Sequence, residues 1–310
     1  MAQLDSESDN LRSALQFFAE TGKTDEEMRL CQALFFYWFF RGQWTEGRRR
    51  LDEALAHSMD RGMTPLRAKT MSDTGMLASM MGDHQTSLAL LEESREIHQQ
   101  QGHAWPLANA LVFLAYELAT TDLPRARKLV EEGVAICRER DNKFFLAMAL
   151  NHQGAIAFVQ KDHETARAVY EEAVALGREL NDNWALASSL RGLGGLALRL
   201  KDYELAATHL KESLASLRNT KEKWFTSRTF DTLAEMYSSQ KDYERAARLF
   251  GAAATTRETV GASLFAFYRE EYENYFDTAR NALGQDRFDS LWSEGRAMTL
   301  EQAALYVLDD

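Results

Sequence analysis

A unit of about forty residues recurs six times along the chain. Six stretches carry it: RGQWTEGRRRLDEAL, MGDHQTSLALLEESR, TTDLPRARKLVEEGV, QKDHETARAVYEEAV, LKDYELAATHLKESL and QKDYERAARLFGAAA. Their equivalent residues follow one another at intervals of 40 or 39 residues: Trp44, His84, Leu123, His163, Tyr203 and Tyr243. Repeats of this length are typical of solenoids, in which each unit buries its apolar face against the next one. The period therefore predicts a solenoid.

Each period has the plan of a helix hairpin. A stretch with apolar residues at helical spacing, such as FLAMALNHQGAIAFVQ, is followed by a short polar turn and a second amphipathic stretch. The turns contain an aspartate that can cap the second helix: Asp83, Asp162, Asp202 and Asp242. The chain has only three prolines, and each falls at a predicted helix start. We therefore expect an all-α fold.

Small residues recur where the two helices of a hairpin should cross. They are Gly75, Ala115, Gly154, Gly194 and Ala234 in the first helices, and Ser87, Ala126, Ala166, Ala206 and Ala246 in the second. Four positions later stands a larger apolar residue: Leu91, Val130, Tyr170, Leu210 or Phe250. This rhythm, with the pair Leu193-Gly194, resembles the tetratricopeptide repeat, whose usual length is about 34 residues. The resemblance implies a right-handed superhelical solenoid, here with longer helices and linkers.

The last fifty or so residues depart from the period. FAFYREEYENYFDTARNALG and TLEQAALYVL have helical spacing, and Thr299 is placed to cap the second of them. Solenoids need an atypical end that covers their last hydrophobic face, although such an end can also dock another domain. We expect a packing helix in residues 1–23, six hairpins in 24–260 and capping helices in 261–310.

Several stretches resemble one group of proteins more specifically. SDNLRSALQFFAETG, FRGQWTEGRRRLDEAL, ARLFGAAATTRETVGA and LWSEGRAMTLEQAALYVL are similar to the helical-repeat region of bacterial STAND-type signalling ATPases and MalT-like (LuxR-type) transcriptional regulators. In that family an ATPase module switches between nucleotide states, and the repeat region senses an inducer or partner. The resemblance covers essentially the whole chain. It implies a sensor region excised from a longer protein.

The motifs of the other modules of that family are missing from this sequence. No G-x-x-x-x-G-K-[ST] loop is present to hold phosphates, and no helix pair with basic flanks is placed to read DNA. No nucleophile–base arrangement is visible either. We expect a non-enzymatic chain without a cofactor, in which any ATPase activity belongs to a domain outside these residues.

Charge and composition exclude further classes. The net charge of -11 argues against direct binding of nucleic acid, which depends on Lys and Arg neutralising phosphates. The apolar run from Ala33 to Phe40 is far shorter than the roughly 20 residues of a membrane span. The N-terminus lacks the features of a signal peptide, and Cys31 and Cys137 suggest no disulfide framework. We therefore expect a cytoplasmic protein.

Two patterns that could indicate chemistry have structural interpretations. His84 and His163 share a repeat position with tyrosines, and His98 and His103 flank a helix-end glycine without an HExxH motif or Cys/His cluster. The sequence therefore predicts no metal site. The glycines of RGLGG, residues 191–195, lie within a helical pattern, which favours close helix packing over a phosphate loop.

The concave wall of such a solenoid is formed by the first helices, and it is the usual binding surface. The repeat register directs a polar and cationic set with aromatics into this groove: Arg29, Gln32, Phe36, Lys69, Ser72, Met76, Asn109, Tyr116, Asn151, Arg191, Arg228, Asp231 and Glu235. Such a set suits a polar effector or an acidic or extended peptide, and we expect binding there.

Three functional interpretations remain open. The chain can be the sensor module of a signalling ATPase or transcriptional regulator, which takes a small effector or peptide and contacts its own ATPase module. It can be a self-standing scaffold that docks another protein, with self-association through the terminal helices. It can also be a receptor of the peptide-pheromone type, because those proteins use repeats of similar length.

Six consecutive aromatic residues, Phe35 to Phe40, lie in the first helix of the first hairpin. At roughly 100° per residue such a row surrounds most of a helix, so the helix must be covered on nearly all sides. We expect most of the row to form the seam with the N-terminal helix. Phe36 is the exception, because the repeat register directs it into the groove.

Overall fold

The computed structural model of the chain describes residues 2–218, 220, 222–264 and 266–309, and every regular element within them is a helix. Two helices precede the hairpins, α1 (Ala2–Ser6) and α2 (Ser8–Glu20). The six hairpins are α3 (Thr24–Arg41) with α4 (Trp44–His57), α5 (Pro65–Met80) with α6 (His84–Gln100), α7 (Ala104–Leu118) with α8 (Leu123–Glu139), α9 (Lys143–Val159) with α10 (His163–Leu180), α11 (Asn183–Arg199) with α12 (Tyr203–Leu217), and α13 (Trp224–Ser239) with α14 (Tyr243–Val260). A short 3-10 helix, Met59–Arg61, follows α4. The chain continues with α15 (Ala266–Leu283), α16 (Gln285–Ala297) and α17 (Leu300–Leu308). The predicted all-helical solenoid is confirmed.

The turns of the hairpins have the predicted caps. The side chains of Asp83, Asp162, Asp202 and Asp242 each accept a hydrogen bond from the backbone N–H three residues later, at 3.1–3.3 Å. These bonds satisfy N–H groups that the first turn of a helix leaves without partners. The aspartate thus marks the start of each of these second helices.

The small residues of the first helices lie against the large residues of the second. A Cβ atom built on Gly154 would be 2.5 Å from the ring of Tyr170, and one on Gly194 would be 2.6 Å from Cγ of Leu210. On Gly75 it would be 2.9 Å from Cγ of Leu91. The small-and-large rhythm of the sequence therefore corresponds to direct contact at the helix crossings.

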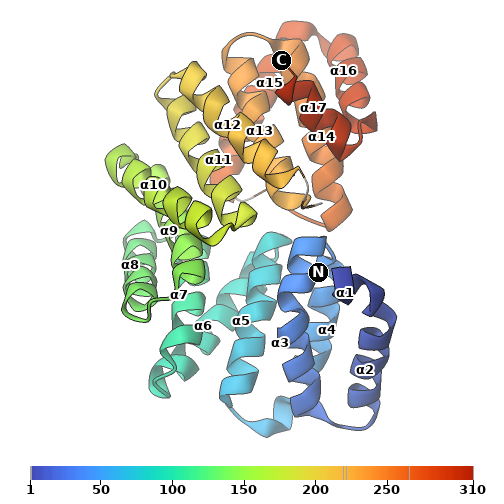
Figure 1. The fold of residues 1–310 in the computed structure, drawn as a ribbon, viewed down its shortest axis with the longest axis vertical. Helices are drawn as coiled ribbons and strands as arrows, with labels where there is room; N and C mark the ends of the chain where they lie inside the picture. Colours follow the sequence, from blue (N-terminus) through green and yellow to red (C-terminus); the bar gives the residue numbers. More distant parts are fainter. Residues whose placement is uncertain (1, 219, 221, 265, 310) are drawn as a thin grey trace.

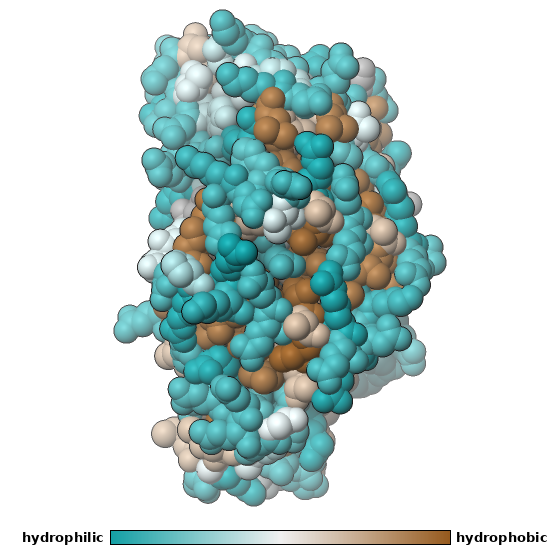
Figure 2. All heavy atoms as spheres, turned by 90° about the vertical axis from the view of Figure 1, so that its left-hand side faces the viewer, coloured by the Kyte–Doolittle hydropathy of each residue, from teal (hydrophilic) through white to brown (hydrophobic). Residues whose placement is uncertain are grey.

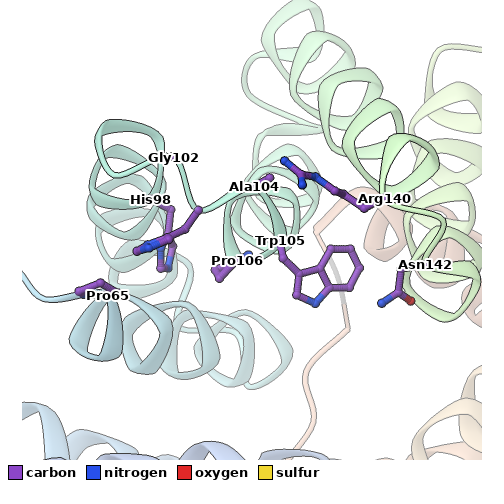
Figure 3. Close-up of a pocket in the computed structure, with 9 residues that line it drawn as sticks. Pro65, His98, Gly102, Ala104, Trp105, Pro106, Arg140 and Asn142 are labelled. Carbon is purple, nitrogen blue, oxygen red and sulfur yellow. The ribbon is translucent and has the colours of Figure 1, made fainter.

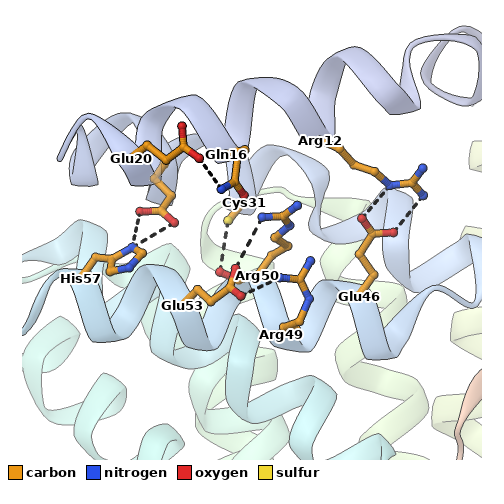
Figure 4. Close-up of polar contacts among 10 residues, drawn as sticks. Arg12, Gln16, Glu20, Cys31, Glu46, Arg49, Arg50, Glu53 and His57 are labelled. Atoms are coloured by element: carbon orange, nitrogen blue, oxygen red, sulfur yellow. Dashed lines mark hydrogen bonds and ion pairs between the residues drawn. The ribbon is translucent and has the colours of Figure 1, made fainter.

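The N-terminal helix α2 is attached to the first hairpin by charge and by apolar packing. Arg12 donates two hydrogen bonds to the carboxylate of Glu46 on α4, at 2.8 and 3.0 Å (Figure 4). Leu15 is buried and lies with Tyr37 and Trp38 of α3. This covering makes one side of the aromatic row part of the core.

The solenoid closes on itself, so that the first hairpins meet the sixth (Figure 1). The ring centroids of Trp44 and Trp224 lie 5.4 Å apart, in an edge-to-face arrangement. The backbone N–H of Ser263, just after α14, donates to the carbonyl oxygen of Met80 on α5 at 3.0 Å. A Cβ atom on Gly42 would stand 2.5 Å from Cγ1 of Val260. The concave side is therefore enclosed instead of open.

This closure changes the expected role of the aromatic row. Tyr37 and Trp38 form the expected seam with α2, but Phe36, Phe39 and Phe40 contact later first helices. Their ring partners are, in turn, Phe144 and Phe145 of α9, Phe225 of α13, and Trp184 of α11. The expectation that most of the row belongs to the N-terminal seam was wrong, because the superhelix turns far enough to bring these helices onto α3.

The face shown in Figure 2 is mainly hydrophilic, with hydrophobic patches between the hydrophilic side chains. Exposed ion pairs join second helices of neighbouring hairpins, as in Arg138–Glu172 at 2.7 Å and Arg178–Glu212 at 2.6 Å. Pairs so exposed contribute little to stability. Of the helices in the described residues, none is long and apolar enough to cross a membrane.

Candidate functional site

A partly enclosed cavity of about 40 Å³ lies on the concave side of the closed solenoid. Every first helix of the six hairpins contributes to its wall, which is formed by Phe39, Met76, Ser79, Met80, Phe113, Tyr116, Asn151, His152, Ala155, Trp184, Arg191, Trp224, Phe225 and Arg228. Its volume exceeds the roughly 10–15 Å³ that a cavity needs to hold a water molecule. In this closed form the cavity has room for water and is far smaller than the roughly 300–1,000 Å³ of typical ligand pockets.

Two arginines form the polar part of the wall. Arg191 of α11 and Arg228 of α13 are 9% and 5% exposed. Tyr268 of α15 lies over both, with its ring centroid 5.8 Å from the guanidinium carbon of Arg191 and 4.2 Å from that of Arg228. Burial and then the charge of Arg191 lower the pKa of Arg228. Arginine nevertheless keeps its charge in proteins, so two cations are held close together in a buried place.

The neutral groups beside these arginines are phenols and an imidazole. Burial raises the pKa of Tyr116 and that of Tyr170, so both hydroxyls remain protonated. Burial lowers the pKa of His152 to about 4, and its Nδ1 lies 2.8 Å from the carbonyl oxygen of Met148. His152 is therefore neutral near pH 7, with the proton on Nδ1. None of these groups supplies a negative charge to the arginines.

The two acidic residues of the expected set are paired within the protein. Asp231 accepts a hydrogen bond at 2.7 Å from Arg257, which comes from the second helix α14. Glu235 lies 3.7 Å from Arg199, and Arg199 also pairs with Glu271 of α15. Burial raises the pKa of Glu235 to about 7. Both carboxyl groups thus join α13 to its neighbours and do not line the cavity.

Several expected groove residues form a ladder of hydrogen bonds between successive first helices. Gln32 donates to the carbonyl oxygen of Leu66 at 2.8 Å, Asn109 donates to Oγ of Ser72 at 3.3 Å, and Asn151 donates to Oγ of Ser189 at 3.3 Å. Each bond joins helices of adjacent hairpins. Gln32, Ser72 and Asn109 therefore hold the wall together without reaching the cavity, whereas Asn151 does both.

The remaining expected residues lie apart from the cavity wall. Lys69 pairs with the buried Asp73 of its own helix. Phe36 is half-buried against the aromatic residues of α9, and Arg29 is exposed. From the expected set, the structure brings to the cavity Met76, Tyr116, Asn151, Arg191 and Arg228. Their role as ligand-binding residues remains a prediction.

Sequence reasoning missed the aromatic residues at the starts of the first helices. Trp105, Phe145, Trp184 and Phe225 recur at about the repeat period, and this recurrence could have identified them. Their rings pair in two edge-to-face contacts: Trp105–Phe145 at 4.3 Å and Trp184–Phe225 at 5.1 Å. Trp184 and Phe225 close one side of the cavity. Tyr268 was also missed, because it lies beyond the repeats and no period indicates its position.

A second hollow, of about 600 Å³, opens on the outer side between the turns that follow α6 and α8. Figure 3 shows Trp105 and Pro106 in the middle of the lining residues, with Arg140 and Asn142 on one side and His98 and Pro65 on the other. His98 is fully buried, its ring nitrogens have no hydrogen-bond partner, and burial lowers its pKa to about 4. Within the described residues no group of three or more His, Cys, Asp or Glu is arranged to hold a metal ion.

Comparison with known proteins identifies the repeat. Two models of the tetratricopeptide repeat match residues 145–219 and 226–261, so these stretches are tetratricopeptide repeats. No curated protein matches the chain at the level of sequence.

Solved structures share the fold over most of the chain. One is a STAND protein with a tetratricopeptide repeat sensor from Pyrococcus horikoshii, with a TM-score of 0.62 and 15% identity over 96% of this chain and 46% of that one. Another is a Rap protein complexed with competence and sporulation factor, with a TM-score of 0.60 and 13% identity over 87% of this chain and 77% of that one. A third is the apo form of the quorum sensor NprR from B. thuringiensis, with a TM-score of 0.60 and 14% identity over 99% of this chain and 84% of that one. At these identities the likeness is one of fold. The chain spans less than half the length of the STAND protein.

Proposed function

We propose that this chain is a non-catalytic sensor module that binds an effector on the concave side of its solenoid. The observation that carries this proposal is the central cavity, to which all six first helices contribute. A molecule bound there contacts every hairpin at once, so its binding can stabilise or change the closure of the whole solenoid. This is the property that a sensor needs, because a ligand shifts an equilibrium only through its differential affinity for the two states.

The similarity of fold supports the same class of function. A STAND protein with a tetratricopeptide repeat sensor and the quorum sensor NprR share this architecture. We infer that the chain acts as the sensor region of a larger signalling ATPase or transcriptional regulator and takes a small effector or a peptide. Either ligand would require the solenoid to open, because the closed cavity measures only about 40 Å³.

The test is a screen of metabolites and short peptides by thermal shift. A ligand at a hundredfold excess over its Kd stabilises the folded protein by about 2.7 kcal/mol, which is readily detected. A hit is then measured by calorimetry on Ala155→Val, which adds two methyl groups to the cavity wall. Ala155 is 4% exposed, so the added volume must enter the cavity or its surroundings.

The matched control is Ala33→Val, on the exposed side of α3. We expect affinity to fall at least tenfold in Ala155→Val and to stay within twofold in Ala33→Val. Equal affinities in both variants would place the ligand elsewhere. A screen without hits, together with a partner protein that binds both variants equally, would favour the scaffold interpretation.

A further inference from the structure

The outer hollow between the turns that follow α6 and α8 has the size and the lining of a ligand site. Its volume of about 600 Å³ lies within the roughly 300–1,000 Å³ of typical ligand pockets. Much of its wall is apolar, with Pro65, Trp105 and Pro106, and none of the described residues that line it is acidic. It shares no lining residue with the central cavity. A second molecule can therefore bind here without opening the solenoid.

The first turn of α7, which borders this hollow, lacks the side-chain cap that neighbouring first helices have. Thr64, Asn142 and Asp182 each accept a hydrogen bond from a backbone N–H in the first turn of α5, α9 or α11. His103 stands at the same position before α7 and makes no such bond. Within the described residues the backbone N–H of Trp105 has no hydrogen-bond partner. A free N–H at the positive end of a helix dipole attracts anions.

Arg140 supplies a positive charge beside this helix start. It directly follows α8, and its side chain extends toward the start of α7 (Figure 3). Arg140 is exposed, and in the part of the chain that the structure describes no carboxylate forms an ion pair with it. The side-chain amide of Asn142 lies on the same side, with its Oδ1 accepting from the N–H of Phe145. The guanidinium fork and the free N–H together favour a ligand group with negative charge.

The opposite side of the hollow adds polar groups whose hydrogen-bonding capacity is unused. His98 is fully buried, and among the described residues neither of its ring nitrogens has a partner. The same holds for Nδ1 of His103, whose ring centroid lies 6.0 Å from that of His98. Burying a polar group without a hydrogen bond costs free energy. The hollow therefore adjoins neutral polar groups that a bound molecule can satisfy, in addition to its cationic side.

We propose that the outer hollow binds a small organic anion, whose carboxylate or phosphate group lies between Arg140 and the backbone N–H of Trp105. The apolar body of the anion lies against the indole of Trp105 and the rings of Pro65 and Pro106. Trp105 is half-buried and held edge-to-face against Phe145 at 4.3 Å, so its ring is a fixed surface for that body. The site lies apart from the concave side, so it goes beyond the sensor function and does not depend on it.

The experiment measures, by calorimetry at constant ionic strength, the binding of three probes that share one aromatic body: sodium benzoate, sodium phenyl phosphate and neutral benzamide. We expect at least one anion to bind at least tenfold more tightly than benzamide, because only the anions pair with Arg140. The tighter anion identifies the preferred group as a carboxylate or a phosphate. Ala155→Val, in the wall of the central cavity, should leave these affinities within twofold, which separates this site from the proposed sensor site.

Two arginine variants decide whether the anion binds at the hollow. Arg140→Gln should weaken the preferred anion at least tenfold and leave benzamide within twofold, whereas Arg167→Gln, on the exposed side of α10, should leave both within twofold. The proposal is overturned if no probe binds, if neither anion binds more tightly than benzamide, or if Arg140→Gln and Arg167→Gln have equal effects. Each of these outcomes would leave the sensor function standing, because that function concerns the central cavity.

Discussion

Replacement of Gly42 by alanine tests whether closure of the solenoid contributes to its stability. Gly42 ends α3 with a φ of 66°, in the left-handed region. Gly22 ends the turn after α2 with a φ of 67°. The two positions thus share the same backbone requirement. They differ in their surroundings, because a Cβ on Gly42 would stand 2.5 Å from Val260 Cγ1, and one on Gly22 would have no neighbour within 4 Å.

The expected magnitudes follow from this difference. An alanine in the left-handed region costs about 1–2 kcal/mol, so Gly22→Ala should destabilise the chain by about that amount. Gly42→Ala adds the overpacking against Val260, for which about 1–3 kcal/mol is typical. We therefore expect Gly42→Ala to be more destabilising than Gly22→Ala by about 1–3 kcal/mol, unless the contact opens and relieves the strain.

Two measurements distinguish these responses. Urea unfolding followed by circular dichroism gives the difference in the free energy of unfolding, and small-angle X-ray scattering gives the radius of gyration. Opening of the closure should enlarge the radius and move the emission of the paired Trp44 and Trp224 to longer wavelength, because water would reach them. If the two variants are equally stable and scatter identically, the contact between Gly42 and Val260 does not contribute to stability.

Two further predictions concern the packing at a helix crossing and the pH dependence of stability. Gly194→Ala places a methyl group 2.6 Å from Leu210 Cγ and should destabilise the chain by about 1–3 kcal/mol. Gly195→Ala, with no atom closer than 3.9 Å, should stabilise it by about 0.5–1 kcal/mol. Thermal unfolding that changes in the same direction for both variants would contradict the crossing geometry. Burial lowers the pKa of His98 to about 4 from its usual 6.5, so between these pH values the unfolded chain takes up a proton that the folded chain refuses, and stability falls as pH falls. His98→Phe should remove about 2 kcal/mol of this loss between pH 7 and pH 4.5, measured by urea titration, and an unchanged pH slope would show that His98 does not contribute.

The hairpins were predictable because their determinants are local. The capping aspartates and the small and large residues of each crossing act within one period of about forty residues. A contact such as Gly154 against Tyr170 joins residues of one hairpin, and the same contact recurs in other periods. Because the unit recurs, the sequence shows the same pairing of a small and a large residue several times.

The candidate site was predictable only in part, because some of its residues contact a second helix or a helix outside the repeats. The register placed Arg191 and Arg228 on the concave wall, where both line the cavity. It could not indicate that Asp231 is paired with Arg257, since that partner comes from the second helix of the hairpin. Nor could it indicate that Tyr268 covers both arginines, because α15 lies outside the periodic part of the chain.

By itself, the sequence determined the all-helical repeat, its caps and crossings, and the absence of a phosphate-binding loop. Only the tertiary structure decided that the groove is closed, with Trp44 on Trp224 and Ser263 bonded to Met80. The physical reason is that closure depends on the sum of small rotations between six successive hairpins. Each rotation is set by the packing of many side chains, and no single period contains the information about their sum.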